Sequence, residues 1–395
     1  MEGNKPAELA RALYAALAAG DRDQLEKLLH PEFVGTIAEG MPFDIGGRHE
    51  GPAAMRRKGW GAIARHFEAR AEPEQFLELA DGRLLVTGRY RGRGKHNGAS
   101  LDAAFAHLIT VDAGQIRTLE QYTDTARWHE AKGPLRTVVL DMADGVATLR
   151  LNRPDQGNAI NPEMAADLLE AATLVAENRS VRAVLIAGNG PNFTVGGDLA
   201  VFAGTARDEL PNRLRRMIDS YHVAIERLTG LDAPVVAAVR GGAGGGGLGL
   251  MYAADIVVAA DDARFALGYG ALGLTADGGN TWFLPRMVGM RRAQELFLLN
   301  RRLTAQEALQ YGLVSRLVAS DSVDAEAAGL AAKLAEGPTL AFGAVRRMLR
   351  QSFETSLSDQ LNAEKHSIVA ASSSDDAGEG IEAFMAKRRP QFRGR

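Results

Sequence analysis

The sequence predicts two domains: an α+β cone over residues 1–133 and an α/β domain with a helical C-terminal part over residues 134–395. The first part shows helical spacing and then strand patterns of period two. In the second part apolar strands and helices alternate until Met290, after which helical spacing dominates. Between them lies a short polar run, 129–134, whose Gly133 and Pro134 are typical of a linker.

Two helices are expected at the start of the first domain, before its strands. Residues 7–21 (AELARALYAALAAGD) and 23–33 (DQLEKLLHPEF) show helical spacing, and Asp21 is placed to cap the second helix. Strand patterns follow, with turn signals at 81–82 and 112–114. The expected strands are FLELA (76–80), RLLVTGRYRG (83–92), SLDAAFAHLITVD (100–112) and QIRTLEQYTD (115–124).

The second domain alternates short apolar strands with helices, as α/β folds do. Strands are expected at 137–141, 145–151, 183–187, 235–239 and 256–260. Helices are expected to begin at Pro162, Glu209 and Gly246.

Composition narrows the class of protein. Apolar residues make up 46% and charged residues 24%, which is ordinary for a globular chain and argues against a fibrous or disordered one. A net charge of -3 gives no general field for nucleic acid. The chain has no cysteine, which excludes disulfides, thiolate metal sites and a cysteine nucleophile. The N-terminus has no apolar signal core, and the histidines show no metal-binding spacing. We therefore expect a cytoplasmic protein with no metal, no permanently bound cofactor, and no nucleic-acid or membrane partner.

The most informative stretch is 235–260, where an apolar strand runs into seven glycines and then into an apolar helix pattern. Such a turn brings backbone N–H groups and a helix N-terminus close to a ligand. A Walker-type phosphate loop is excluded, because Leu248-Gly249-Leu250 stands where Gly-Lys-Ser/Thr is needed. A dinucleotide fingerprint of the G-x-G-x-x-G type remains a weaker alternative. An oxyanion hole is the third interpretation, and a second glycine turn at 196–197 could supply its other donor.

Six motifs lie between about residue 135 and the end of the chain. They are LNRPDQGNAIN (151–161), NFTVGGDL (192–199), APVVAAVRGGAGGGGLGL (233–250), ADGGNTWFLPRMVG (276–289), LTAQEALQYGLVSRLV (303–318) and FMAKRRPQF (384–392). In order and spacing they resemble the enoyl-CoA hydratase/isomerase family, also called the crotonase superfamily. The resemblance implies repeated ββα units, a helical C-terminal part, and a trimer or paired trimers.

The resemblance also implies site residues. The backbone N–H groups of Gly197 and Gly246 would form an oxyanion hole for an acyl thioester, carried on coenzyme A or on a carrier protein. The coenzyme A path would pass near four residues: Asn152, Arg153, Phe384 and Lys387.

The acid–base residues of the family's hydratases are missing. Their two glutamates fall on Gly249 and Tyr269 in this chain. Water addition is most simply served by two proton-handling groups, so ordinary hydratase activity is not expected. Asp277 falls where several isomerases of the family carry a working aspartate. It also matches the nucleophilic aspartate of 4-chlorobenzoyl-CoA dehalogenase, and His222 matches that enzyme's active-site histidine.

These matches leave several functions open. As a base, Asp277 would move a proton and shift a double bond; as a nucleophile, it would form an ester that water then cleaves. We favour the isomerase, with Tyr269 as a pocket residue. A dehalogenase or thioester hydrolase, an acyl-CoA binding protein without catalysis, and a hydratase with non-standard acid/base residues remain alternatives.

The first domain resembles the SnoaL-like branch of the NTF2-like superfamily. The resemblance rests on YAALAAGDRDQLEKLLHPEF (14–33), GMPFDIGGRHEGPAAM (40–55) and AHLITVDAGQIRTLEQYTDTA (106–126). It implies a cone with an internal pocket and a tendency to dimerise. The polar residues expected near that pocket are Asp44, His49, His107, Tyr122 and Asp124. The fusion points to a polyketide-like or aromatic intermediate, by analogy of fold alone.

Overall fold

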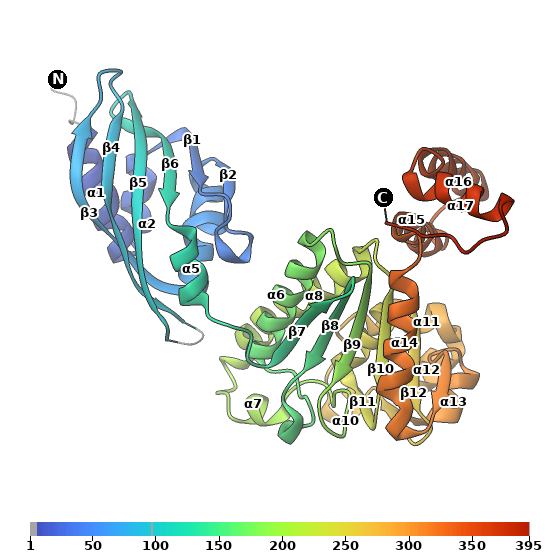
Figure 1. Ribbon diagram of the computed structural model, residues 1–395. Coiled ribbons are helices and arrows are strands. Elements are labelled where there is room, and N and C mark those ends of the chain that lie inside the picture. The colour runs from blue at the N-terminus through green and yellow to red at the C-terminus, as the bar shows by residue number, and fades with distance from the viewer. Residues whose placement is uncertain (1–5, 96–97, 395) are drawn as a thin grey trace. The chain divides into compact units, whose positions relative to one another are not determined.

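A computed structural model describes residues 6–95 and 98–394. Its contacts divide the chain into two compact units, Met1–Pro134 and Leu135–Arg395. Each unit has its own hydrophobic core and its own main β-sheet (Figure 1). Within the described residues, no helix is long and apolar enough to cross a bilayer.

The first unit is an α+β fold built on one curved sheet of six strands in the order β2-β1-β6-β5-β4-β3. The strands are β1 (Leu29–Ile37), β2 (Gly47–Glu50), β3 (Phe67–Glu78), β4 (Leu84–Gly94), β5 (Ser100–Asp112) and β6 (Gln115–Thr123). The helices are α1 (Pro6–Ala19), α2 (Arg22–Leu28), η1 (Pro42–Asp44), α3 (Pro52–Ala54), η2 (Met55–Trp60), α4 (Gly61–His66) and α5 (Thr125–Lys132). Buried and more exposed residues alternate along β4 and β5, so one face of the sheet lines the core.

One helix expectation in this unit is wrong. The second helix was expected over 23–33, but α2 ends at Leu28 and β1 begins at Leu29. Pro31 lacks an N–H and clashes with the preceding turn, so the helix cannot continue through it. Phe33 and Ile37 are instead buried from a strand. Asp21 caps α2 as expected, because its side chain accepts a hydrogen bond from the Gln24 N–H.

The second unit is an α/β fold with a main sheet in the order β15-β12-β10-β9-β8-β7 and a small sheet in the order β11-β13-β14. The strands are β7 (Val138–Ala143), β8 (Val146–Leu151), β9 (Ala183–Gly188), β10 (Val235–Val239), β11 (Gly242–Gly244), β12 (Ile256–Ala260), β13 (Arg264–Ala266), β14 (Arg302–Thr304) and β15 (Arg316–Val318). β7 and β8 are antiparallel, whereas β8, β9, β10, β12 and β15 run parallel. Every residue of β9 and β10 is buried, which explains their unbroken apolar runs.

Helices cover this sheet and then dominate the chain, as the sequence predicts. Up to the end of the small sheet they are η3 (Pro154–Gln156), α6 (Pro162–Glu177), α7 (Leu199–Ala203), α8 (Leu210–Gly230), η4 (Gly245–Gly247), α9 (Leu248–Ala253), α10 (Tyr269–Leu272), α11 (Asn280–Val288) and α12 (Met290–Leu298). The later ones are α13 (Ala305–Gln310), η5 (Ser320–Ser322), α14 (Val323–Ala335), α15 (Thr339–Gln351), α16 (Leu357–Ala371) and α17 (Asp375–Met385). α6 and α8 pack on each other, and α14 packs on β9, β10 and β12 (Figure 1).

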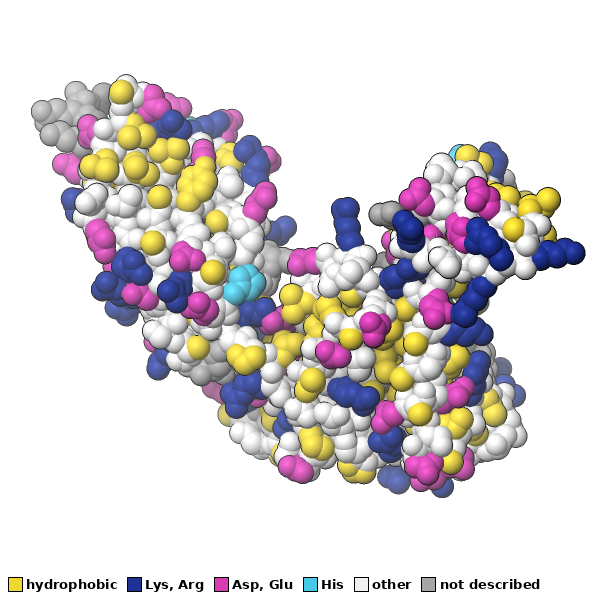
Figure 2. Space-filling view, viewed as in Figure 1, with side chains coloured by type: hydrophobic (Ala, Val, Ile, Leu, Met, Phe, Trp, Pro, Cys, Tyr) yellow, Lys and Arg dark blue, Asp and Glu magenta, His cyan; other side chains and the backbone are white. Residues whose placement is uncertain are grey.

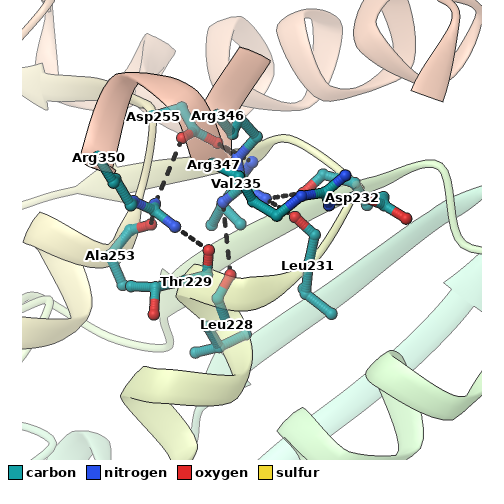
Figure 3. Close-up of polar contacts among 11 residues, drawn as sticks. Leu228, Thr229, Leu231, Asp232, Val235, Ala253, Asp255, Arg346, Arg347 and Arg350 are labelled. Carbon is teal, nitrogen blue, oxygen red and sulfur yellow. Dashed lines mark hydrogen bonds and ion pairs between the residues drawn. The ribbon is translucent and has the colours of Figure 1, made fainter. Parts of the chain in front are cut away.

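Arginines of α15 attach the last helices to the rest of the unit (Figure 3). Arg346 is buried and donates to the carbonyl groups of Leu231 and Ala233 while its Nε lies 2.6 Å from Asp255 Oδ2. Arg350 donates to the Thr229 carbonyl near the end of α8. Helix C-termini carry unpaired carbonyl groups and partial negative charge, so guanidinium groups are well suited to cap them.

Candidate functional site

The glycine run after β10 forms a helix N-terminus. β10 leads into β11, then into the short 3-10 helix η4 over Gly245–Gly247, and then into α9. The first N–H groups of a helix have no partner within the helix, so the Gly246 N–H is available to a ligand. The sequence placed the helix start at Gly246, and the structure has it within this turn.

The second glycine turn packs directly against the first. A parallel bridge joins Ile160 to Gly197 through two hydrogen bonds, one from Ile160 N–H to Gly196 O (2.8 Å) and one from Asp198 N–H to Ile160 O (2.9 Å). The N–H of Gly197 therefore points away from Ile160, since alternate residues of a strand pair in opposite directions. A methyl group placed on Gly196 would lie 2.7 Å from Gly244 O, so the two turns touch backbone to backbone.

Asp277 lies beside the first turn. A methyl group placed on Gly246 would lie 2.7 Å from Asp277 Oδ1 and 3.3 Å from Oδ2. A methyl group placed on Gly278 would lie 2.5 Å from the carbonyl oxygen of Gly246. The Asp277–Gly278 segment and the Gly246 turn are therefore in van der Waals contact. A methyl group on Gly278 would clash with backbone, whereas one on Gly246 would have to displace the Asp277 carboxylate.

Tyr269 holds the Asp277 carboxylate. Its hydroxyl donates to Asp277 Oδ1 at 2.6 Å. Burial and the negative charge of Asp277 raise the pKa of Tyr269 far above its ordinary value. The hydroxyl thus remains protonated near neutral pH and donates to one carboxylate oxygen, which leaves Oδ2 as the oxygen that can take a proton.

Two neighbouring residues of α8 contact the same segments. The Tyr221 hydroxyl, which is buried, donates to Gly246 O at 2.7 Å. His222 Nε2 accepts a hydrogen bond from the Gly278 N–H at 3.0 Å, so this nitrogen carries no proton. His222 therefore contacts the backbone next to Asp277, and it also lines a cavity of about 330 Å³ with Gly279, Trp282 and other residues.

The sequence missed Tyr221 and Asn280. Tyr221 lies on the buried face of α8, where an aromatic residue looks like ordinary core. Asn280 begins α11 and is completely buried. Its Nδ2 lies within hydrogen-bond distance of Asp277 O (2.8 Å), Tyr269 Oη (3.1 Å) and Gly245 O (3.2 Å), so its two protons are shared among three acceptors. A buried asparagine has no sequence signature that separates it from a helix cap.

Of the four residues expected near a coenzyme A path, two have internal partners. Arg153 donates to the Ala159 carbonyl and pairs with Asp198 at 2.8 Å, which fixes the start of α7. Asn152 accepts a hydrogen bond from Asn189 at 3.0 Å. Phe384 is 82% exposed on α17, and Lys387 follows that helix. All four remain predictions.

In the first unit the structure places His49 and His107 inside, but not Tyr122 or Asp124. His107 Nδ1 lies 2.7 Å from the Tyr14 hydroxyl and Nε2 lies 3.0 Å from the Tyr90 hydroxyl. Burial lowers the pKa of His107 to about 3, so its ring is neutral. Gln121, which the sequence analysis missed, pairs with His107 across β5 and β6 and is also buried.

The expectation for Tyr122 and Asp124 is wrong, and its reason is the alternation of side chains along a strand. Tyr122 follows the inward-facing Gln121, so it points outward, is 57% exposed and donates to Glu120. Asp124 is exposed and caps α5. Asp44 ends η1, and its side chain lies outside the described part of the structure.

Comparisons with known proteins agree with this architecture. Residues 141–395 match the family model of enoyl-CoA hydratase/isomerase, and residues 10–119 match that of the SnoaL-like domain. The 1,2-epoxyphenylacetyl-CoA isomerase of Escherichia coli (strain K12) is 37% identical over 251 residues, which are 64% of this chain and 96% of the relative. The 4-chlorobenzoyl coenzyme A dehalogenase-2 of Arthrobacter sp is 31% identical over 63% of this chain and 91% of the relative.

A solved structure gives the same result. The enoyl-CoA hydratase from Polaromonas sp. JS666 superposes with a TM-score of 0.62 at 33% identity, over 65% of this chain and 99% of that chain. The first family model covers well over half of the sequence, and its range includes both glycine turns. The chain therefore belongs to the enoyl-CoA hydratase/isomerase family, with a SnoaL-like domain at its N-terminus.

Proposed function

We propose that the protein is an acyl-thioester isomerase that uses Asp277 as its base and Gly197 and Gly246 as its oxyanion hole. The observation that carries the proposal is the position of Asp277, whose two carboxylate oxygens would lie 2.7 and 3.3 Å from a methyl group on Gly246. A thioester carbonyl bound at the Gly246 N–H would thus present its neighbouring carbons to the carboxylate.

The reaction needs only one proton-transfer group. Asp277 takes a proton from the carbon next to the thioester, and the electron pair of that C–H bond moves into the carbonyl, where the two N–H groups stabilise the enolate oxygen. The protonated Asp277 then returns the proton two carbons away, and the double bond moves by one position. No atom is gained or lost, and no cofactor takes part.

Geometry disfavours the hydratase alternative. The first hydratase glutamate would stand at Gly249, where even a methyl group would lie 2.1 Å from Gly278 O. This neighbour is backbone and cannot swing aside, so the position has no room for a glutamate. The second glutamate is replaced by Tyr269, whose hydroxyl is already donated to Asp277. Hydration would need other groups to activate water.

The nucleophile alternative has a specific observation in its favour, because one relative of 31% identity is a 4-chlorobenzoyl coenzyme A dehalogenase. Attack by Asp277 would leave an ester on the enzyme, which water would cleave. The hydrogen bond from the Tyr269 hydroxyl withdraws electron density from the carboxylate and weakens it both as a nucleophile and as a base, so a test for a covalent adduct is needed to separate the two roles.

The test is deuterium uptake by mass spectrometry over 2-enoyl, 3-enoyl, aryl and arylacetyl-CoA thioesters, with carrier-protein thioesters of the same acyl groups as a second series. We expect exchange at the alpha and gamma carbons in the wild-type enzyme and none above background in Asp277→Asn. A covalent Asp277 adduct, or release of halide or free acid, would contradict the isomerase and support a dehalogenase or hydrolase that uses Asp277 as its nucleophile. If the wild-type protein and Asp277→Asn bind the thioesters equally and neither reacts with them, the protein binds acyl thioesters without catalysis.

Oligomerisation is part of the proposal. Exposed apolar side chains of the last three helices and of the loop between α15 and α16 include Leu349, Phe353, Leu357, Ile368, Val369, Ile381 and Phe384, and Figure 2 shows apolar side chains beside Lys and Arg in this region. α15, α16 and α17 also enclose a largely apolar groove of about 1010 Å³. Apolar surface of this extent is typical of an interface. A homotrimer or a hexamer is expected in sedimentation, and a monomer at micromolar concentration would contradict it.

The SnoaL-like domain has its own site in this proposal. Both amide atoms of Gln121 and Nε2 of His49 are buried without a hydrogen-bond partner in the described ranges. His107 is neutral, so the interior favours an uncharged ligand that presents a donor beside an acceptor. In a thermal-shift assay we expect 2-pyridone, which presents a donor beside an acceptor, to raise the melting temperature of the wild-type protein. It should not raise that of Gln121→Met. Equal melting shifts in both proteins would contradict this site.

A further inference from the structure

We infer that Asn280 is a positioning residue that fixes the oxyanion-hole donor and the base relative to each other. Its Nδ2 contacts three acceptors that belong to both halves of the proposed site: the carbonyl of Gly245, the Tyr269 hydroxyl and the carbonyl of Asp277. The inference rests on the proposed function, and the experiment below separates the two.

The contact with Gly245 acts on the Gly246 N–H. The carbonyl of Gly245 and the N–H of Gly246 belong to one planar trans peptide, so they point in opposite directions and rotate together. A donor bound to that carbonyl at 3.2 Å fixes the peptide with its N–H directed away from Asn280. It also polarises the peptide, which makes the N–H a stronger donor.

The contact with Tyr269 acts on the base. The Tyr269 hydroxyl donates its only proton to Asp277 Oδ1, so it must accept from Asn280 Nδ2 at 3.1 Å. The result is a chain of donors from Asn280 through Tyr269 to the Asp277 carboxylate. The bond to Asp277 O at 2.8 Å holds the backbone of the same residue.

The orientation of the Asn280 amide follows from its surroundings. With nitrogen and oxygen exchanged, the side-chain oxygen would face two carbonyl oxygens, which is repulsive. In the observed orientation, Oδ1 is buried and has no partner among the residues that the structure describes. An unpartnered buried acceptor lowers stability, so an apolar residue would serve packing alone better. An asparagine at this position is explained by the three acceptors that its NH2 group holds in place: the Gly245 carbonyl, the Tyr269 hydroxyl and the Asp277 carbonyl.

The experiment compares Asn280→Ala and Asn280→Leu with the wild-type protein, and uses Thr281→Ala, an exposed position on the same helical turn, as control. The leucine has a similar branched shape without polar atoms, so it fills the site if alanine disturbs folding. We expect alpha-carbon exchange to fall about 10-fold to 100-fold in both variants, with KM changed less than about threefold and the melting temperature preserved. Thr281→Ala should match the wild-type enzyme.

A second readout reports the oxyanion hole directly. The carbonyl stretch of ¹³C-labelled benzoyl-CoA, which has no alpha proton, is measured by infrared difference spectroscopy in each complex. Wild-type protein should lower this frequency, and the Asn280 variants should lower it less. An unshifted frequency in the wild-type protein would overturn the proposed oxyanion hole. A full shift in both variants, or an unchanged exchange rate, would overturn the role of Asn280 alone.

Discussion

Replacing Gly246 by alanine should disable the site through a displacement that can be read from the structure. The new methyl group would lie 2.7 Å from Asp277 Oδ1, whereas ordinary contacts begin near 3.4 Å. The carboxylate must therefore move by about 0.7 Å, the difference between these distances, and it cannot do so without stretching its 2.6 Å bond from Tyr269. A misplacement of this size near the reacting atoms typically reduces the rate about 100-fold.

The variant should still fold, with a loss of stability similar in free energy to its loss of activity. Overpacking of this kind costs about 1 to 3 kcal/mol, and the backbone of Gly246 has no positive φ that would add strain. The rate is measured by deuterium exchange and the stability by urea unfolding. Gly329→Ala is the matched control, because a methyl group there meets nothing within 4 Å and α14 gains from alanine. Wild-type exchange in Gly246→Ala would refute the proposed roles of Gly246 and Asp277.

Two further predictions concern stability. Arg346→Met should lower the free energy of unfolding by about 1 to 3 kcal/mol, because it leaves the carbonyl groups of Leu231 and Ala233 without their buried donor and the partly exposed Asp255 without its closest cation. Scanning calorimetry checks this, and an unchanged unfolding free energy would contradict the anchoring of α15 by Arg346. The pKa of His107 falls from 6.5 to about 3 on folding, so below pH 6.5 the unfolded chain binds a proton that the folded chain does not. Stability should therefore decrease by up to about 1.4 kcal/mol per pH unit as the pH falls from 6.5 towards 3. His107→Phe should remove this slope in urea titrations at pH 7 and pH 5, and an equal slope in both proteins would contradict it.

In the second unit, β9, β10 and β12 could be predicted closely because they are buried on both faces, whereas the short strands β11, β13, β14 and β15 were not predicted. β10 and β12 have the predicted bounds, since an unbroken apolar run between turn residues allows few alternatives. α2 was predicted too long because Leu29 continues its apolar spacing, and only Pro31 signals the change. Tyr122 was misplaced for a similar reason: a shift of one residue along a strand exchanges the two faces, and the sequence alone does not fix which face is inside.

The backbone part of the site could be anticipated because glycine at such density has few other uses. The side chains that support it could not. Tyr221, Tyr269 and Asn280 come from three separate segments and meet at the Gly246 turn and Asp277, and each also fits an ordinary structural role in sequence. What distinguishes them is the identity of their partners, which only coordinates provide.

The side chains around Gly246 that can transfer protons indicate which reaction the site suits. Neither position that carries a glutamate in the family's hydratases has a carboxylate in this chain. Gly249 has no room for one, and Tyr269 has a hydroxyl that stays protonated. A site with two independent carboxylates suits the addition of water, in which one group activates water while the other handles the carbon-bound proton. A site with a single carboxylate, held by a neutral donor, suits a reaction in which the same group takes a proton and returns it. If Tyr269 serves that purpose, Tyr269→Phe should lower the transfer to the gamma carbon more than the exchange at the alpha carbon, since an unheld Asp277 can still remove a proton, though more slowly, but no longer delivers it to a defined position.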